Sequence, residues 1–142
     1  MVGSNAPRWY CWFSGIFLLA QGVSTLVARL VPAVDRAAPW LLATTHMQPL
    51  HSTLHIATAL LAFAVLAAGA RAAWRFAAGF GAFYLALGSV GAATGRGLGL
   101  HLQAFDHPFH ILFGGLGVAA ALAGRRLVGA PSRPAGKQGD RT

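Results

Sequence analysis

The chain alternates long apolar segments with short polar ones. Four apolar runs, at about 10–30, 51–70, 74–94 and 107–124, have interiors without charged residues. A hydrocarbon core of about 30 Å needs roughly 20 helical residues to cross it, so each run is long enough to span a bilayer. The pattern predicts an all-α integral membrane protein whose single domain, 1–126, carries four transmembrane helices.

Proline, charge and polar residues mark the connections. The segment 28–48 is too rich in proline and charge for a spanning helix and is predicted to be an external loop. Within it, the segment 39–42 (PWLL) favours a short interfacial helix, because Trp prefers the headgroup level. Asp106 is suited to cap the fourth helix, with Pro108 in its first turn. The polar segment 127–142 is predicted to be a disordered cytoplasmic tail.

Two internal similarities indicate a duplicated fold. The segment 15–22 (GIFLLAQG) resembles 81–88 (GAFYLALG), and the pair 55–56 (HI) aligns with 110–111 (HI) at the start of the following apolar run. We therefore expect two helical hairpins of the same orientation, related by an axis along the membrane normal.

The first apolar run has an alternative interpretation as a cleaved signal peptide. Arg8 would be its basic start, and a small-residue cleavage site would lie near Ala28. The repeat favours a retained helix, because the first and third helices are then equivalent parts of one fold.

Composition agrees with a membrane protein. The chain is 56% hydrophobic and 10% charged, far from the makeup of a soluble domain. The net charge of +8 does not indicate nucleic acid, because the basic residues stand at the ends of apolar runs and form no recognisable nucleic-acid-binding motif. They are more numerous on the side of the termini, which predicts that both termini are cytoplasmic. The one cysteine, Cys11, excludes an internal disulfide.

Histidines gather where the second and fourth helices begin. Neighbours three or four residues apart share a helix face, so these side chains are expected to converge at the extracytoplasmic mouth of the bundle. Such a cluster suits zinc or copper, and Met47 would favour copper(I) if it joined. A tetrapyrrole, haem or bacteriochlorophyll, held by His55, His110 or both is a further alternative. The candidate ligands are His51, His55, Asp106, His107 and His110.

A structural interpretation of these histidines stays open beside the cofactor one. A histidine in the first turn of a membrane helix can hydrogen-bond the adjoining loop or a neighbouring helix, which satisfies polar groups that lipid cannot. In that case His55 and His110 would be separate hydrogen-bonding residues and no ligand would be bound. Gln21, in the first helix, is a weaker candidate for the same kind of interhelical bond.

Other function classes are disfavoured. No acidic or basic residue lies in the interior of a span, whereas ion-coupled transporters place ionisable groups near the midplane. The chain has only three carboxylates and no Ser-His-Asp order or phosphate-binding loop, so we expect no enzyme.

Small residues offer smooth helix faces for close packing. The segment 91–95 (GAATG) is a GxxxG motif, and the fourth helix continues the theme. This glycine content suggests a non-catalytic accessory subunit that contacts lipid and packs against other membrane-protein subunits of a larger complex, respiratory or photosynthetic. A metal-, haem- or chlorin-binding protein is the alternative. The packing candidates are Gly91, Gly95, Gly114, Gly115 and Gly117.

Three motifs in order carry a family resemblance, over the stretch from position 51 to 122. They are 51–56 (HSTLHI), 81–88 (GAFYLALG) and 106–114 (DHPFHILFG). They resemble the motifs His-Asn-x-x-His-Leu, Gly-x-x-Tyr-Leu-x-x-x-Gly and Asp-Asn-x-x-His-Leu-x-x-Gly of an uncharacterised bacterial family of small four-helix membrane proteins, a domain of unknown function. Ser52 and His107 stand at the family's asparagine positions. The resemblance implies a multi-pass protein of a bacterial inner or intracytoplasmic membrane, and it implies no activity.

Overall fold

The computed structural model describes residues 5–45, 47–95 and 102–125, and within these ranges the regular structure is entirely helical. Four helices are long and apolar enough to cross a membrane, which confirms the predicted fold class. The predicted tail at 127–142 lies outside the described residues, as do His46 and His101. The helices are α1 (Ala6–Leu30), α2 (Pro32–Ala37), α3 (Trp40–Thr45), α4 (Pro49–Ala68), α5 (Ala70–Thr94) and α6 (Asp106–Gly124).

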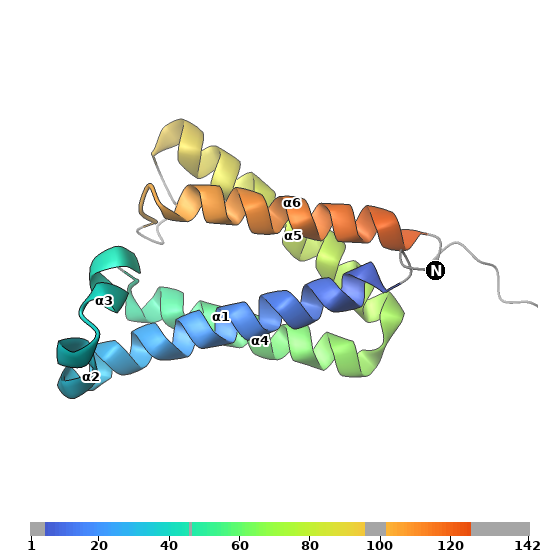
Figure 1. Cartoon of the computed structure of the whole chain (residues 1–142). Helices are drawn as coiled ribbons and strands as arrows, with labels where there is room; N and C mark the ends of the chain where they lie inside the picture. The colour runs from blue at the N-terminus through green and yellow to red at the C-terminus, as the bar shows by residue number, and fades with distance from the viewer. Residues whose placement is uncertain (1–4, 46, 96–101, 126–142) are drawn as a thin grey trace, which may run out of the picture.

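The long helices form two hairpins. Helix α1 packs along α4 in hairpin 1, and α5 packs along α6 in hairpin 2 (Figure 1). Helices α1 and α5 run in the same direction, so the connections α1–α4 and α5–α6 lie at one end of the bundle, here called the loop end. The connection α4–α5 lies at the opposite end, the turn end. The predicted pair of equally oriented hairpins is therefore confirmed.

The connection between the hairpins is a single glycine. Helix α4 ends at Ala68 and α5 begins at Ala70, with Gly69 between them at φ 105°. This backbone conformation strains any residue with a Cβ atom. The sequence analysis placed the break between Arg71 and Trp74, whereas both residues belong to α5. Charge misled the prediction here, because arginines are tolerated in the first turns of a membrane helix.

The external loop contains two short helices. Helix α3 confirms a short helix at the PWLL segment, beginning at Trp40, whereas α2, with Pro32 as its first residue, was not predicted. Proline suits this place because its missing N–H has no partner in a helix's first turn. The loop is attached to α1 by Arg29, whose Nη2 donates a hydrogen bond of 2.7 Å to the carbonyl oxygen of Met47.

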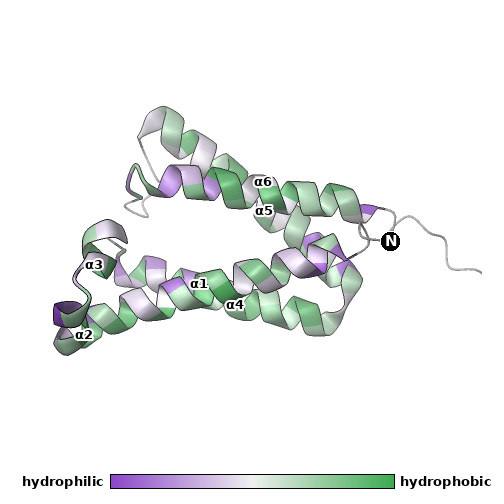
Figure 2. Ribbon diagram, viewed as in Figure 1, coloured by the Kyte–Doolittle hydropathy of each residue, from purple (hydrophilic) through white to green (hydrophobic). Residues whose placement is uncertain are grey.

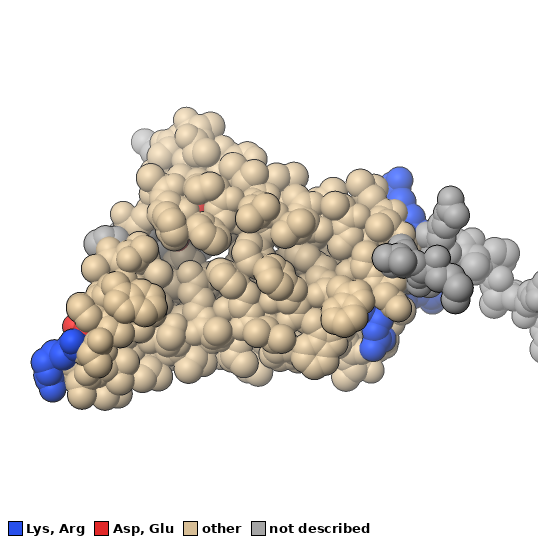
Figure 3. Space-filling view, viewed as in Figure 1, with Lys and Arg blue, Asp and Glu red and all other residues tan. Residues whose placement is uncertain are grey.

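The hairpins pack closely at the turn end and diverge at the loop end (Figure 1). At the turn end the core consists of small and aromatic side chains from all four long helices, and the Tyr10 hydroxyl donates a 3.1 Å hydrogen bond to the carbonyl oxygen of Phe113. The outer surfaces of the long helices are largely apolar, and arginines stand near both ends of the bundle (Figures 2 and 3). This distribution suits a lipid-embedded bundle.

Most helical glycines serve contacts within the bundle. A Cβ atom at Gly81 would lie 2.7 Å from the backbone nitrogen of Val118, and one at Gly114 would collide with the backbone of Leu85. Among the described helical glycines, only Gly79 and Gly115 would meet nothing. The close approach of α5 and α6 therefore depends on glycine.

Of the five glycines predicted to pack against other helices, three lie in contacts within the bundle and two do not. Gly91, Gly114 and Gly117 pack inside the bundle, against His107, Leu85 and Tyr10 respectively. Gly95 instead caps the C-terminus of α5 at φ 66°, and Gly115 faces open space.

We predict that Gly114→Ala lowers the free energy of unfolding by about 1–3 kcal/mol, because the added methyl group pushes two helix backbones apart. The neighbouring change Gly115→Ala is the matched control, and it should alter stability by no more than about 0.5 kcal/mol. Thermal unfolding in detergent measures both. Equal effects of the two changes would contradict the close packing described here.

Candidate metal centre

Three buried imidazoles converge between the hairpins. His51 and His55 lie one turn apart on the same face of α4, and His110 lies in the first half of α6. One ring nitrogen from each comes within 4.8 Å of the others. The rings of His51 and His55 meet edge to face at 4.6 Å between centroids. No side chain of the three is more than 6% exposed.

The repeat places these residues at one depth. A Cβ atom at Gly22 of α1 would lie 2.7 Å from the carbonyl oxygen of Ser52, and one at Gly88 of α5 would lie 2.8 Å from that of His107. In both hairpins the two helices therefore approach closely at equivalent points, next to His55 and His110. These two histidines are structural equivalents, as the sequence repeat predicts.

Three buried ring nitrogens of His55 and His110 have no hydrogen-bond partner in the described chain. Neither ring nitrogen of His55 has a hydrogen-bond partner within the described part of the chain, and Nδ1 of His110 has none either. A buried polar group without a partner costs roughly 1–3 kcal/mol. The structural interpretation requires His55 to hydrogen-bond a loop or a neighbouring helix. The described chain contains no such bond to the ring nitrogens of His55.

The imidazoles border a small, partly open cavity of about 20 Å³ between the hairpins. A volume of this size holds about one water molecule or one ion. The lining combines one polar side with one aromatic side. The residues are Phe17, Leu18, Gln21, His51, His55, Tyr84, Phe105, Asp106, Phe109, His110 and Phe113.

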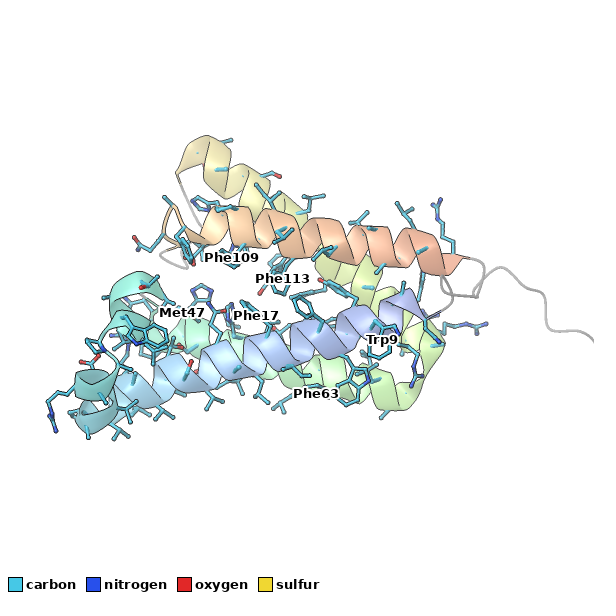
Figure 4. The ribbon with its side chains drawn as sticks, in the orientation of Figure 1. Trp9, Phe17, Met47, Phe63, Phe109 and Phe113 are labelled. Carbon is cyan, nitrogen blue, oxygen red and sulfur yellow. The ribbon has the colours of Figure 1, made fainter. Side chains whose placement is uncertain are left out.

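Aromatic rings close the side of the cavity between α1 and α6. Phe109 and Phe113 of α6 point toward Phe17 of α1 (Figure 4). The ring of Phe17 is nearly parallel to that of Phe109 at 6.4 Å and lies 4.7 Å from that of Phe113. On the α5 side, the ring of Tyr84 meets His110 edge to face at 4.8 Å. These rings hold the site in a low-dielectric environment, in which an ion interacts strongly with its ligands.

Neither this aromatic wall nor Tyr84 was predicted from the sequence. The repeat contained a signal for Tyr84, because Leu18 and Tyr84 occupy equivalent places in segments 15–22 and 81–88 and both line the cavity. The phenylalanines carried no such signal, since Phe is equally common on lipid-facing surfaces.

Two predicted ligands behave differently from the three histidines. Asp106 lines the cavity, but its carboxylate is not one of the groups within 4.8 Å, and its Oδ2 accepts a 2.8 Å hydrogen bond from the Gln103 N–H. His107 does not line the cavity; its ring lies where a Cβ atom of Gly91 would be. Only glycine at this point of α5 leaves room for the ring.

Met47 is also outside the site. It is buried, at 1% exposure, but it is not among the residues that line the cavity. Its backbone carbonyl instead holds Arg29.

Comparison with protein-family models, with curated proteins and with solved structures finds no match to this chain. The resemblance to a small bacterial membrane-protein family therefore stays a prediction, and the site is interpreted from its own chemistry.

We predict that His55→Leu raises the stability of the metal-free protein by about 1–3 kcal/mol, because it replaces a buried imidazole without partners by an apolar side chain of similar volume. Thermal unfolding in detergent with a chelator measures the change.

The control is Ser52→Ala in the same helix. Ser52 is equally buried, but its hydroxyl lies 2.9 Å from that of Thr25, so this change should lower stability by about 1 kcal/mol. A loss of stability in both variants would show that His55 is satisfied by hydrogen bonding.

Proposed function

We propose that this protein binds a divalent transition-metal ion, zinc or copper(II), inside the membrane through His51, His55 and His110. One observation carries the proposal: three buried imidazoles bring ring nitrogens within 4.8 Å of one another while both nitrogens of His55 have no other described partner. Neutral imidazole is a preferred ligand of both metals. A bound ion would supply the missing partners.

The size of the cavity favours an ion over a tetrapyrrole. Haem or bacteriochlorophyll needs a pocket of several hundred Å³, whereas the cavity that the imidazoles border has a volume of about 20 Å³. The position of Met47 also bears on the metal. Copper(I) prefers sulfur ligands, and the cavity is lined by nitrogen, oxygen and aromatic groups without Met47. Zinc and copper(II) suit this donor set better.

The accessory-subunit function stays a prediction with less support than it had from sequence. This prediction was based on an excess of glycine, but most described helical glycines pack against other helices of the same bundle. The free positions, Gly79 and Gly115, lie on different helices and form no GxxxG motif.

We further propose that both termini are cytoplasmic and that the metal centre lies toward the extracytoplasmic side. The support is the distribution of charge near the helix ends. Arg8, Arg71, Arg75 and Arg125 stand at the turn end, and the sequence after α6 adds further basic residues. The loop end has Arg29 and Arg36 together with Asp35 and Asp106, and the sequence between α5 and α6 adds one arginine, Arg96. The positive-inside rule assigns the more basic side to the cytoplasm.

We expect purified wild-type protein to bind about one equivalent of zinc or copper(II). His55→Leu and His110→Leu should each lose most of the bound metal, because a site that lacks one of three ligands is already broken. Metal analysis and isothermal titration in detergent measure this.

The matched control is His107→Asn, which changes a buried histidine of the same helix that faces Gly91 rather than the cavity. It should bind metal as the wild type does. The proposed site would be refuted if the wild type bound no metal in the titration. It would also be refuted if His107→Asn lost as much bound metal as His55→Leu and His110→Leu.

Orientation is testable by labelling single cysteines in a Cys11→Ser background. Ala37→Cys at the loop end should react with a membrane-impermeant maleimide in intact cells, because this end faces outward. Ala68→Cys at the turn end should react only after the membrane is opened. The reverse pattern would overturn the proposed orientation.

A further inference from the structure

Asp106 is a buried carboxylate beside the three imidazoles. It is 8% exposed, and no lysine or arginine is among the residues that line its cavity. Buried carboxylates are rare unless a cation or several hydrogen bonds compensate them. Its Oδ2 accepts a 2.8 Å hydrogen bond from the backbone N–H of Gln103. A cation in the cavity that Asp106 lines would compensate the charge of the carboxylate.

The repeat gives Asp106 an equivalent in hairpin 1. Each hairpin has a first-turn residue followed one helical turn later by a histidine: His51 and His55 in α4, Asp106 and His110 in α6. His51 and His55 both contribute to the cluster. Asp106 therefore occupies in hairpin 2 the place that a metal-ligating imidazole occupies in hairpin 1.

We propose, on the basis of the metal site proposed above, that Asp106 is the fourth ligand of the ion, so that each hairpin supplies two ligands. Charge favours this arrangement. Three neutral imidazoles leave a divalent ion with its full charge in a low-dielectric site, whereas one carboxylate halves the net charge. Three histidines and one carboxylate form the closed four-coordinate set typical of a structural site rather than of a catalytic one.

Binding in this manner requires a small movement. The carboxylate lines the cavity but lies outside the 4.8 Å group, so it must turn or the hairpins must draw together. Helices α4 and α6 are not among the pairs that pack extensively on each other in the described chain. The ion would therefore be the principal link between them at the loop end.

Cobalt(II) is a suitable probe, because its visible spectrum reports the number and type of ligands at a zinc-like site. The wild type should show a four-coordinate spectrum that azide does not change, since no position is open. In Asp106→Asn a water molecule should take the fourth position, so azide should shift the spectrum and affinity should fall by at least about 10-fold to 100-fold. The asparagine oxygen can still accept the bond from Gln103.

Two further variants complete the test. Asp106→His copies the residue at the equivalent place in hairpin 1, so it should keep a closed site that azide does not enter. Asp35→Asn removes a carboxylate from α2, away from the cavity, and should leave spectrum and affinity unchanged.

The outcomes separate this inference from the metal site on which it rests. Suppose that azide shifts the spectrum of the cobalt-loaded wild type, and that Asp106→Asn has the same cobalt affinity and spectrum as the wild type. Asp106 is then not a ligand, whereas the three-histidine site remains supported. If the wild type binds no cobalt, zinc or copper, both proposals fail.

Discussion

The structure depends on how closely glycine lets two helix backbones approach. Gly22 and Gly88 are equivalent points of close approach between α1 and α4 and between α5 and α6, and a methyl group at either would meet a backbone atom of the partner helix. In lipid, such close packing replaces the hydrophobic effect as the force that holds helices together. Because these contacts lie next to His55 and His110, they also help to determine the depth of the imidazoles.

The two hairpins have diverged around a shared crossing. In hairpin 1 the side chains of Thr25 and Ser52 lie near Gly22, and their hydroxyls are hydrogen-bonded to each other. At the equivalent place in hairpin 2 stand Gly91 and His107, where a large ring occupies the room left by the missing side chain. The exchange roughly preserves volume and removes a polar contact, so the ring of His107 packs against α5, where its Nδ1 has no hydrogen-bond partner in the described chain.

The fold could be predicted from the sequence because its main determinants are local. Length and apolarity define the spans, and the repeated glycine and histidine spacing defines the hairpins and the equivalence of His55 and His110. The composition of the site could not be predicted in full. Whether His107 faces the cavity or α5 depends on the empty space at Gly91, and the wall formed by Phe17, Phe109 and Phe113 depends on how the hairpins cross. Both are properties of three-dimensional packing that no local spacing records.

The single-residue connection at Gly69 gives the molecule a pivot. With no slack between α4 and α5 and a dense core beside them, the hairpins can change their relative position chiefly by rotation about the turn end. A helix of 25 residues such as α5 is about 38 Å long, so it acts as a lever arm. A rotation of about five degrees at its base displaces its tip by about 3 Å. A small rotation at the turn end would thereby be amplified into a larger change in the separation of the hairpins around the imidazoles.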